Sequence, residues 1–153
     1  MRWPWRLGCL CLVGANCAVP RGRAPLVSPV GTAPTELLGA FQDDYGINYR
    51  IDADAWHQGE RTTYHVRTWH ANERYLIARN ASSNPSGADR WTRIDWMPLP
   101  GMAPYEWAYC LSAYEARTPA AAEATEVARR DAPRTGCNGF PFSRMKRIDA
   151  RPR

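Results

Sequence analysis

The sequence lacks the motifs that identify most nucleotide-dependent and zinc-dependent enzymes. It contains no phosphate-binding glycine loop, no Rossmann glycine pattern and no zinc-binding set of paired cysteines. A Gly-x-Ser-x-Gly elbow is also absent, so Ser112, His65 and an aspartate have no spacing that indicates a catalytic triad. No diagnostic active-site motif remains, and the sequence favours a binding protein over an enzyme.

Lysine is scarce, and the positive charge that is present is spread along the chain. Lys146 is the only lysine of the 153 residues, and the formal net charge is +5. Nucleic-acid-binding domains concentrate arginine and lysine in one patch, whereas these arginines are dispersed. We therefore expect no nucleic-acid partner.

Long hydrophobic runs are missing as well. The apolar run at 7–13 is too short to span a bilayer, but it follows the basic residues Arg2 and Arg6, as in a secretory signal. We predict a signal peptide at 1–17 and a secreted, periplasmic or cell-envelope location. An alternative is a lipoprotein signal in which Cys17 is lipidated, and a membrane would then be contacted only through that anchor.

The chain has room for one domain after the export segment. Proline and glycine recur between 18 and 35, which predicts an extended, unpacked linker. We expect a single β-rich domain at 36–148 and a short tail at 149–153.

Alternation of apolar and polar residues dominates the domain, and this pattern is typical of half-buried strands. In the longest run, Trp107, Tyr109 and Leu111 fall on one face. The pattern predicts an antiparallel meander of five or six strands. The expected strands cover 45–52, 61–69, 73–79, 91–97, 104–114 and 139–145.

One C-terminal α-helix is predicted at 118–130. Thr118 and Pro119 form a good N-cap and first-turn pair, and the alanine-rich run that follows has high helical propensity. Its apolar side is shallow, so we expect the helix to lie on the outside of the sheet.

Cys110 and Cys137 are the two cysteines that remain after the export segment. Cysteines of an exported domain normally pair, so we predict a disulfide between them. The alternative, a cysteine nucleophile, needs a nearby base and a reducing compartment.

Charged side chains give weaker signals. Arg93 and Asp95 share a strand face, and an ion pair that points inward would anchor a ligand in a wet pocket. His57, His65 and His70 have irregular spacing, so we predict no metal site and no cofactor. Asp43 and Asp44 fit a turn, but a secreted hydrolase that uses Asp43, Asp44, Asp95 or His65 remains an alternative.

The layout resembles a lipocalin or wider calycin barrel. Gly39-Ala40-Phe41 stands where that family has Gly-x-Trp, and the late helix, the disulfide and Arg144 on a return strand add to the likeness. The family's Thr-Asp-Tyr signature is absent. The resemblance implies a barrel that binds small apolar molecules in its mouth, with Phe41 and Arg144 closing the other end.

These patterns together predict an exported domain that binds a small hydrophobic molecule inside the sheet. An alternative is a surface-interaction module with an exposed aromatic patch, and the oligomeric state stays open. The expected ligand-binding residues are Tyr45, Tyr49, Tyr64, Arg93, Asp95, Trp107 and Tyr109.

Overall fold

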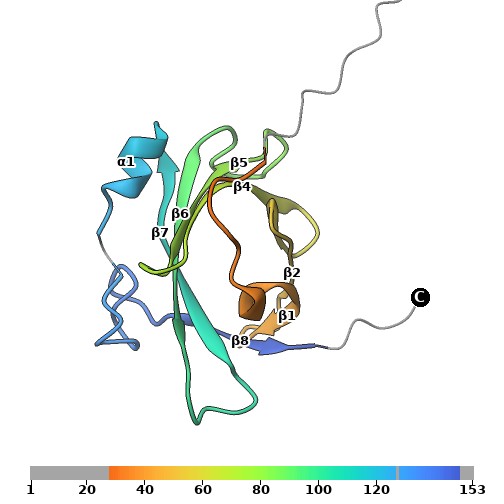
Figure 1. The fold of residues 1–153 in the computed structure, drawn as a ribbon, viewed down its shortest axis with the longest axis vertical. Coiled ribbons are helices and arrows are strands. Elements are labelled where there is room, and N and C mark those ends of the chain that lie inside the picture. Colours follow the sequence, from red (N-terminus) through yellow and green to blue (C-terminus); the bar gives the residue numbers. More distant parts are fainter. Residues whose placement is uncertain (1–27, 127, 149–153) are drawn as a thin grey trace, which may run out of the picture.

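Eight antiparallel strands form a closed barrel in chain order (Figure 1). The computed structural model describes residues 28–126 and 128–148. The predicted signal peptide with Cys17, the linker as far as residue 27 and the tail lie outside these residues. The strands are β1 Gly39–Asp43, β2 Asn48–Ile51, β3 Ala55–Gln58, β4 Thr62–His70, β5 Tyr75–Asn80, β6 Trp91–Pro98, β7 Trp107–Ala116 and β8 Ser143–Arg147. The mainly β fold class is thereby confirmed.

The prediction of five or six strands missed β1 and β3, which have only five and four residues. The first predicted strand also begins three residues later than expected. Asp43 accepts the backbone N–H groups of Tyr45 and Ile47, and this makes residues 44–47 a turn between β1 and β2. The last strand likewise begins at Ser143 and not at Gly139.

The inner face of the barrel is apolar and largely aromatic. It buries Phe41, Trp56 and Leu76 completely, and smaller residues fill the spaces between the rings. Because every second residue of a strand points inward, the alternation in the sequence supplies this core from all eight strands.

Residues 28–38 lie across the barrel next to β4 and then enter β1 (Figure 1). Val30 donates to Arg67 O and accepts from Trp69 N, both at 2.8 Å. Gly31 has φ +83° and lies against the Trp69 backbone, where a Cβ would clash. A 3-10 turn, η1 Thr35–Leu37, then places Leu37 in the core. The backbone at Val30 and Gly31 is therefore held against β4, although most of residues 28–35 are exposed.

The barrel closes where β8 pairs with β1, beside an arginine that stacks on Phe41. This arginine is Arg147, whose guanidinium lies 4.5 Å from the ring centre and donates to Leu38 O and Glu36 O at 2.9 and 3.0 Å. The expectation that Arg144 closes this end is wrong. Arg144 lies three residues earlier on β8 and points to the outer surface.

The described part of the connection from β7 to β8, residues 117–126 and 128–142, lies on the outer wall of the barrel and is called the cover segment below (Figure 1). Its helix, α1 Pro119–Glu123, contacts β5, β6 and β7 from outside, and Thr118 caps it as predicted. The predicted helix to Arg130 is too long. Farther along, Ala128 pairs with Cys137 through the backbone, and this pairing is incompatible with a helix.

A second, smaller core lies between the cover segment and the outer wall. It contains Leu99, Ala108, Cys110 and Phe142. The predicted disulfide between Cys110 and Cys137 is present, with the sulfur atoms 2.07 Å apart. It fastens the cover segment to β7.

Candidate functional site

Four of the predicted ligand-binding residues meet inside the barrel. Tyr49, Tyr64, Trp107 and Tyr109 are all at most 7% exposed. Tyr109 packs edge-on against both Trp56 and Tyr49, with ring centres 5.3 and 5.8 Å apart. These rings belong to the core of the barrel, where they pack against one another.

The interior tyrosines also share a hydrogen-bond chain. The Tyr49 hydroxyl donates to Asp43 at 2.8 Å and lies 2.8 Å from the Tyr109 hydroxyl. Burial raises the pKa of Tyr49 and Tyr109 well above the ordinary value, and it raises the pKa of Tyr64 to about 12. A buried phenol with a raised pKa stays protonated, so this chain supports the core and offers no base.

Two other polar groups of the interior, unlike the tyrosine hydroxyls, make no hydrogen bond within the described part of the chain. Among the residues that the structure describes, the indole N–H groups of Trp56 and Trp107 are the buried side-chain polar atoms without a hydrogen-bond partner. Their rings lie 5.8 Å apart, close to perpendicular. The two rings therefore contact each other edge-on, while their N–H groups have no acceptor among the described residues.

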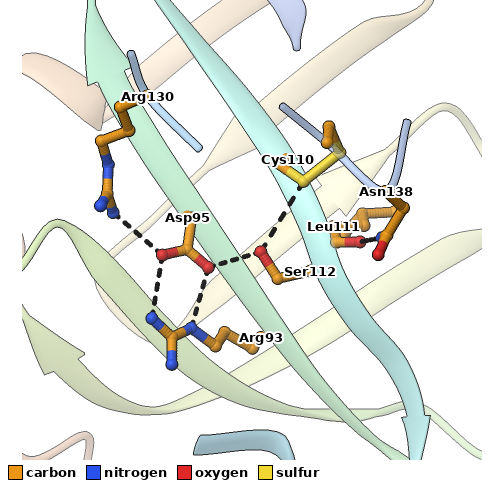
Figure 2. Close-up of a disulfide and its surroundings, with 8 residues drawn as sticks. Arg93, Asp95, Cys110, Leu111, Ser112, Arg130 and Asn138 are labelled. Atoms are coloured by element: carbon orange, nitrogen blue, oxygen red, sulfur yellow. Dashed lines mark hydrogen bonds and ion pairs between the residues drawn. A yellow bond between two sulfur atoms is a disulfide. The ribbon is translucent and has the colours of Figure 1, made fainter. Parts of the chain in front are cut away.

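Arg93 and Asp95 lie on the outer wall, so the prediction that they anchor a ligand inside the barrel is wrong. Ile94 and Trp96 take the inward positions of β6. The Asp95 carboxylate is 1% exposed and accepts from Arg93 at 2.8 and 3.0 Å, from Ser112 at 2.6 Å and from Arg130 at 2.9 Å (Figure 2). The sequence revealed their shared face but not which side of the sheet it occupies.

This network binds the cover segment to the barrel. Arg93 donates to Glu123 O at 2.6 Å, and Arg130 donates to Trp96 O at 2.9 Å. Because every oxygen of Asp95 is already an acceptor for a charged or hydroxyl donor, the carboxylate has no free basic site. We interpret it as a structural anchor.

The residues of the hydrolase alternative do not converge. Asp43 is used by the β1–β2 turn, and Asp95 is used by the arginines. Ser112 donates directly to Asp95, so no histidine lies between them. His65 lies on β4, opposite Ala55 of β3 and Arg79 of β5. Tyr75 is the β5 residue opposite Asp95, and its partner on β4 is His70 rather than His65. Within residues 28–126 and 128–148, no group of metal-binding side chains was found either.

A groove of about 730 Å³ lies outside the barrel, beside the second core. Its lining comes from the β1–β2 turn, the hairpin between β6 and β7 and the later part of the cover segment, together with Ala108 of β7 and Arg144 of β8. Its walls are mainly apolar, and Tyr45, a predicted binding residue, is 71% exposed beside it and outside the barrel interior where we expected it. The lining residues are Asp44, Tyr45, Leu99, Met102, Ala108, Pro133, Arg134, Pro141, Phe142 and Arg144.

Two arginines and one aspartate are the charged residues of this groove. Arg144 Nε donates to Asp44 at 2.9 Å, and its guanidinium lies 4.7 Å from the centre of the Tyr105 ring. The hydrogen bond to Asp44 raises the pKa of Arg144 further, so it stays charged. The sequence suggested other roles for Asp44 and Arg144 and did not predict that they meet, because they are 100 residues apart in the chain.

A shallower groove of about 490 Å³ lies next to the first, and Tyr45 and Pro141 border both. Three exposed aromatic side chains surround it: Tyr45, Tyr114 and Phe140. This is the described surface that best fits the predicted exposed aromatic patch.

No family model, curated protein or solved structure matches this chain. Within the described residues, no helix is long and apolar enough to cross a membrane. The disulfide is of the kind found in oxidising compartments, which agrees with the expected export.

Proposed function

We propose that this protein binds a small, largely apolar molecule in the groove outside the barrel. The observation that carries the proposal is the combination of size and lining: about 730 Å³, apolar walls and a few convergent polar groups. Sites for small ligands have volumes of roughly 300–1,000 Å³ and this same mixture of side chains.

The aromatic packing inside the barrel supports an outer site. The five aromatic rings of Phe41, Tyr49, Trp56, Trp107 and Tyr109 contact one another edge-on. A ligand that entered between these rings would have to displace them from their edge-on contacts, which is costly.

The resemblance to calycin barrels supports a binding role in general. Arg147 lies over Phe41 and reaches the carbonyl groups around the 3-10 turn, so the first and last strands are joined at one end of the barrel. Lipocalins hold their ligands within the barrel. The site that we propose for this protein lies instead in the outer groove.

Titration with Nile red, a neutral apolar dye, tests the proposal. Met102 is 42% exposed and lines the groove, so Met102→Glu is expected to lower the affinity about tenfold without unfolding the protein. Ile47→Glu is the matched control, because Ile47 is 38% exposed and lies outside the groove lining. Absence of saturable binding, or equal binding by wild type and Met102→Glu, would overturn the proposal.

A second candidate is a docking surface for another protein. The specific observation is Phe140, which is 72% exposed beside the shallower groove. Phe140→Ser separates the candidates. It leaves Nile red binding unchanged if the larger groove is the site, whereas loss of dye binding in this variant would move the apolar site to the aromatic patch.

A further inference from the structure

We infer that the ligand of the outer groove carries a single carboxylate, held by Arg144 and Arg134, on an apolar body. The inference rests on the proposed function, because it names the chemical class that the same groove would take. Four observations carry it: the fixed orientation of Arg144, its free donors, the unpaired Arg134 and the position of the apolar walls.

Arg144 is held in place before any ligand arrives. Its backbone N–H donates to Asp44 Oδ1 at 3.2 Å, and its Nε donates to Asp44 Oδ2 at 2.9 Å. The Tyr105 ring lies against the guanidinium on its flat face. A side chain fixed in this way loses little conformational freedom when it binds an anion.

The terminal nitrogens of Arg144 have no acceptor among the described residues, and the side chain is 43% exposed. Asp44 uses only the Nε atom. The two terminal N–H₂ groups together form the fork that matches the two oxygens of a carboxylate. The remaining donors of Arg144 are thus suited to a planar anion.

Arg134 adds a second positive charge to the groove. It is exposed and has no ion-pair or hydrogen-bond partner within the part of the chain that the structure describes. Two arginines against Asp44 leave the lining with one net positive charge. This single net charge can be neutralised by a monoanion. The second negative charge of a dianion would have no positive partner in the groove and would be repelled by Asp44.

The same groove also has apolar walls. Leu99 and Phe142 are 8% and 3% exposed and come from the second core, and Met102 closes the side of the groove toward solvent. An alkyl or aryl body would cover Leu99 and Met102 while its carboxylate meets Arg144. Both parts of such a ligand therefore find a complementary surface in one groove.

Calorimetric titration with sodium decanoate and with 1-decanol at pH 8 tests the inference. We expect wild type to bind decanoate about tenfold more tightly than decanol, with an affinity for decanoate that falls as salt is added. Arg144→Gln should remove about this tenfold advantage and leave decanol binding unchanged. Arg129→Gln is the control for charge, since Arg129 is 71% exposed and lies outside the groove lining.

The possible failures are distinguishable. Equal affinities for decanoate and decanol, both reduced by Met102→Glu, would overturn the carboxylate inference while the proposed function stands. Binding of neither molecule would overturn the proposed function. Tighter binding of decyl phosphate than of decanoate would replace the carboxylate by a phosphate ester. Arg144→Lys guards against a folding defect, because it keeps the charge but not the fork and should restore only part of the preference.

Discussion

Strand β6 separates two regions that are equally buried and built in opposite ways. On its inner face, Ile94 and Trp96 pack into an aromatic core. On its outer face, Arg93 and Asp95 are 9% and 1% exposed, although both are charged. The inner face is satisfied by contact between apolar surfaces, whereas the outer face is satisfied by pairing of charges.

The cover segment explains this difference. An antiparallel barrel normally exposes its outer face to water, but α1 and the disulfide-bound chain shield β6 and β7 on that side. A charge that is shielded from water must be compensated by partners, and Asp95 has Arg93, Arg130 and Ser112. Removal of one member of this charged network should therefore lower the unfolding free energy by more than the loss of its buried apolar area would.

The largest expected effect comes from Asp95→Ala. The change leaves Arg93 and Arg130 near each other without a counter-charge, and breaking such a buried pair costs about 3–5 kcal/mol of unfolding free energy. Asp52→Ala is the matched control. Asp52 is 44% exposed in its pair with Arg50, and exposed pairs contribute about 0–1 kcal/mol. Urea unfolding measures both, and similar losses in the two variants would show that the outer wall is effectively hydrated.

Removal of the disulfide should affect the outer wall before the interior. For a separation of 27 residues between Cys110 and Cys137, the chain-entropy model gives about 3–4 kcal/mol. We expect the Cys110→Ala/Cys137→Ala variant to be cleaved faster by trypsin in the cover segment. The near-UV circular dichroism of the interior tryptophans should persist during this cleavage. If that signal were lost at the same rate as the cover segment is cleaved, the interior and the outer wall would not unfold independently.

High pH should act on the interior instead. The pKa of Tyr64 is raised from 10.0 to about 12, and burial raises that of Tyr49 and Tyr109 in the same direction. The unfolded chain then loses these protons first. The stabilising contribution is complete below pH 10 and is lost as the pH rises toward 12, by about 2–3 kcal/mol for Tyr64.

Urea unfolding between pH 8 and 11.5, with tyrosinate absorbance as the second signal, measures this effect. Tyr64→Phe should flatten the fall in stability above pH 10. A variant whose stability falls as steeply as that of wild type would show that Tyr64 is not the group responsible.

Much of the barrel was predictable from local patterns, but its short strands and its sidedness were not. The alternation in β4 and β7 identifies them, whereas β3 offers one large inward residue, Trp56, and no repeat of the pattern. Five consecutive residues of β6, from Thr92 to Trp96, are buried. The charges of Arg93 and Asp95 share their face with Trp91 and Met97, and this mixture hid from the sequence pattern which side of the strand faces the core.

The helix and the groove depend on contacts between distant segments. Helical propensity favours the whole run after Thr118, but the pairing of Ala128 with Cys137 imposes extended backbone there. The groove forms only when β1 and β8 pair, because this brings Asp44 to Arg144. Neither contact has a signature within a window of neighbouring residues.

The stacking of Arg147 on Phe41 has a consequence for how fast the barrel folds. The hydrogen bonds of the same arginine join β8 to the carbonyl groups of Leu38 and Glu36, which lie 109 and 111 residues earlier in the chain. Loop closure over such a distance carries an entropic cost before any contact energy is gained, and topologies dominated by distant contacts fold slowly. The strands from β2 to β7 pair with their neighbours in sequence, so they can assemble as an open sheet. Closure by Arg147 is then the step that requires the whole domain to be present at once.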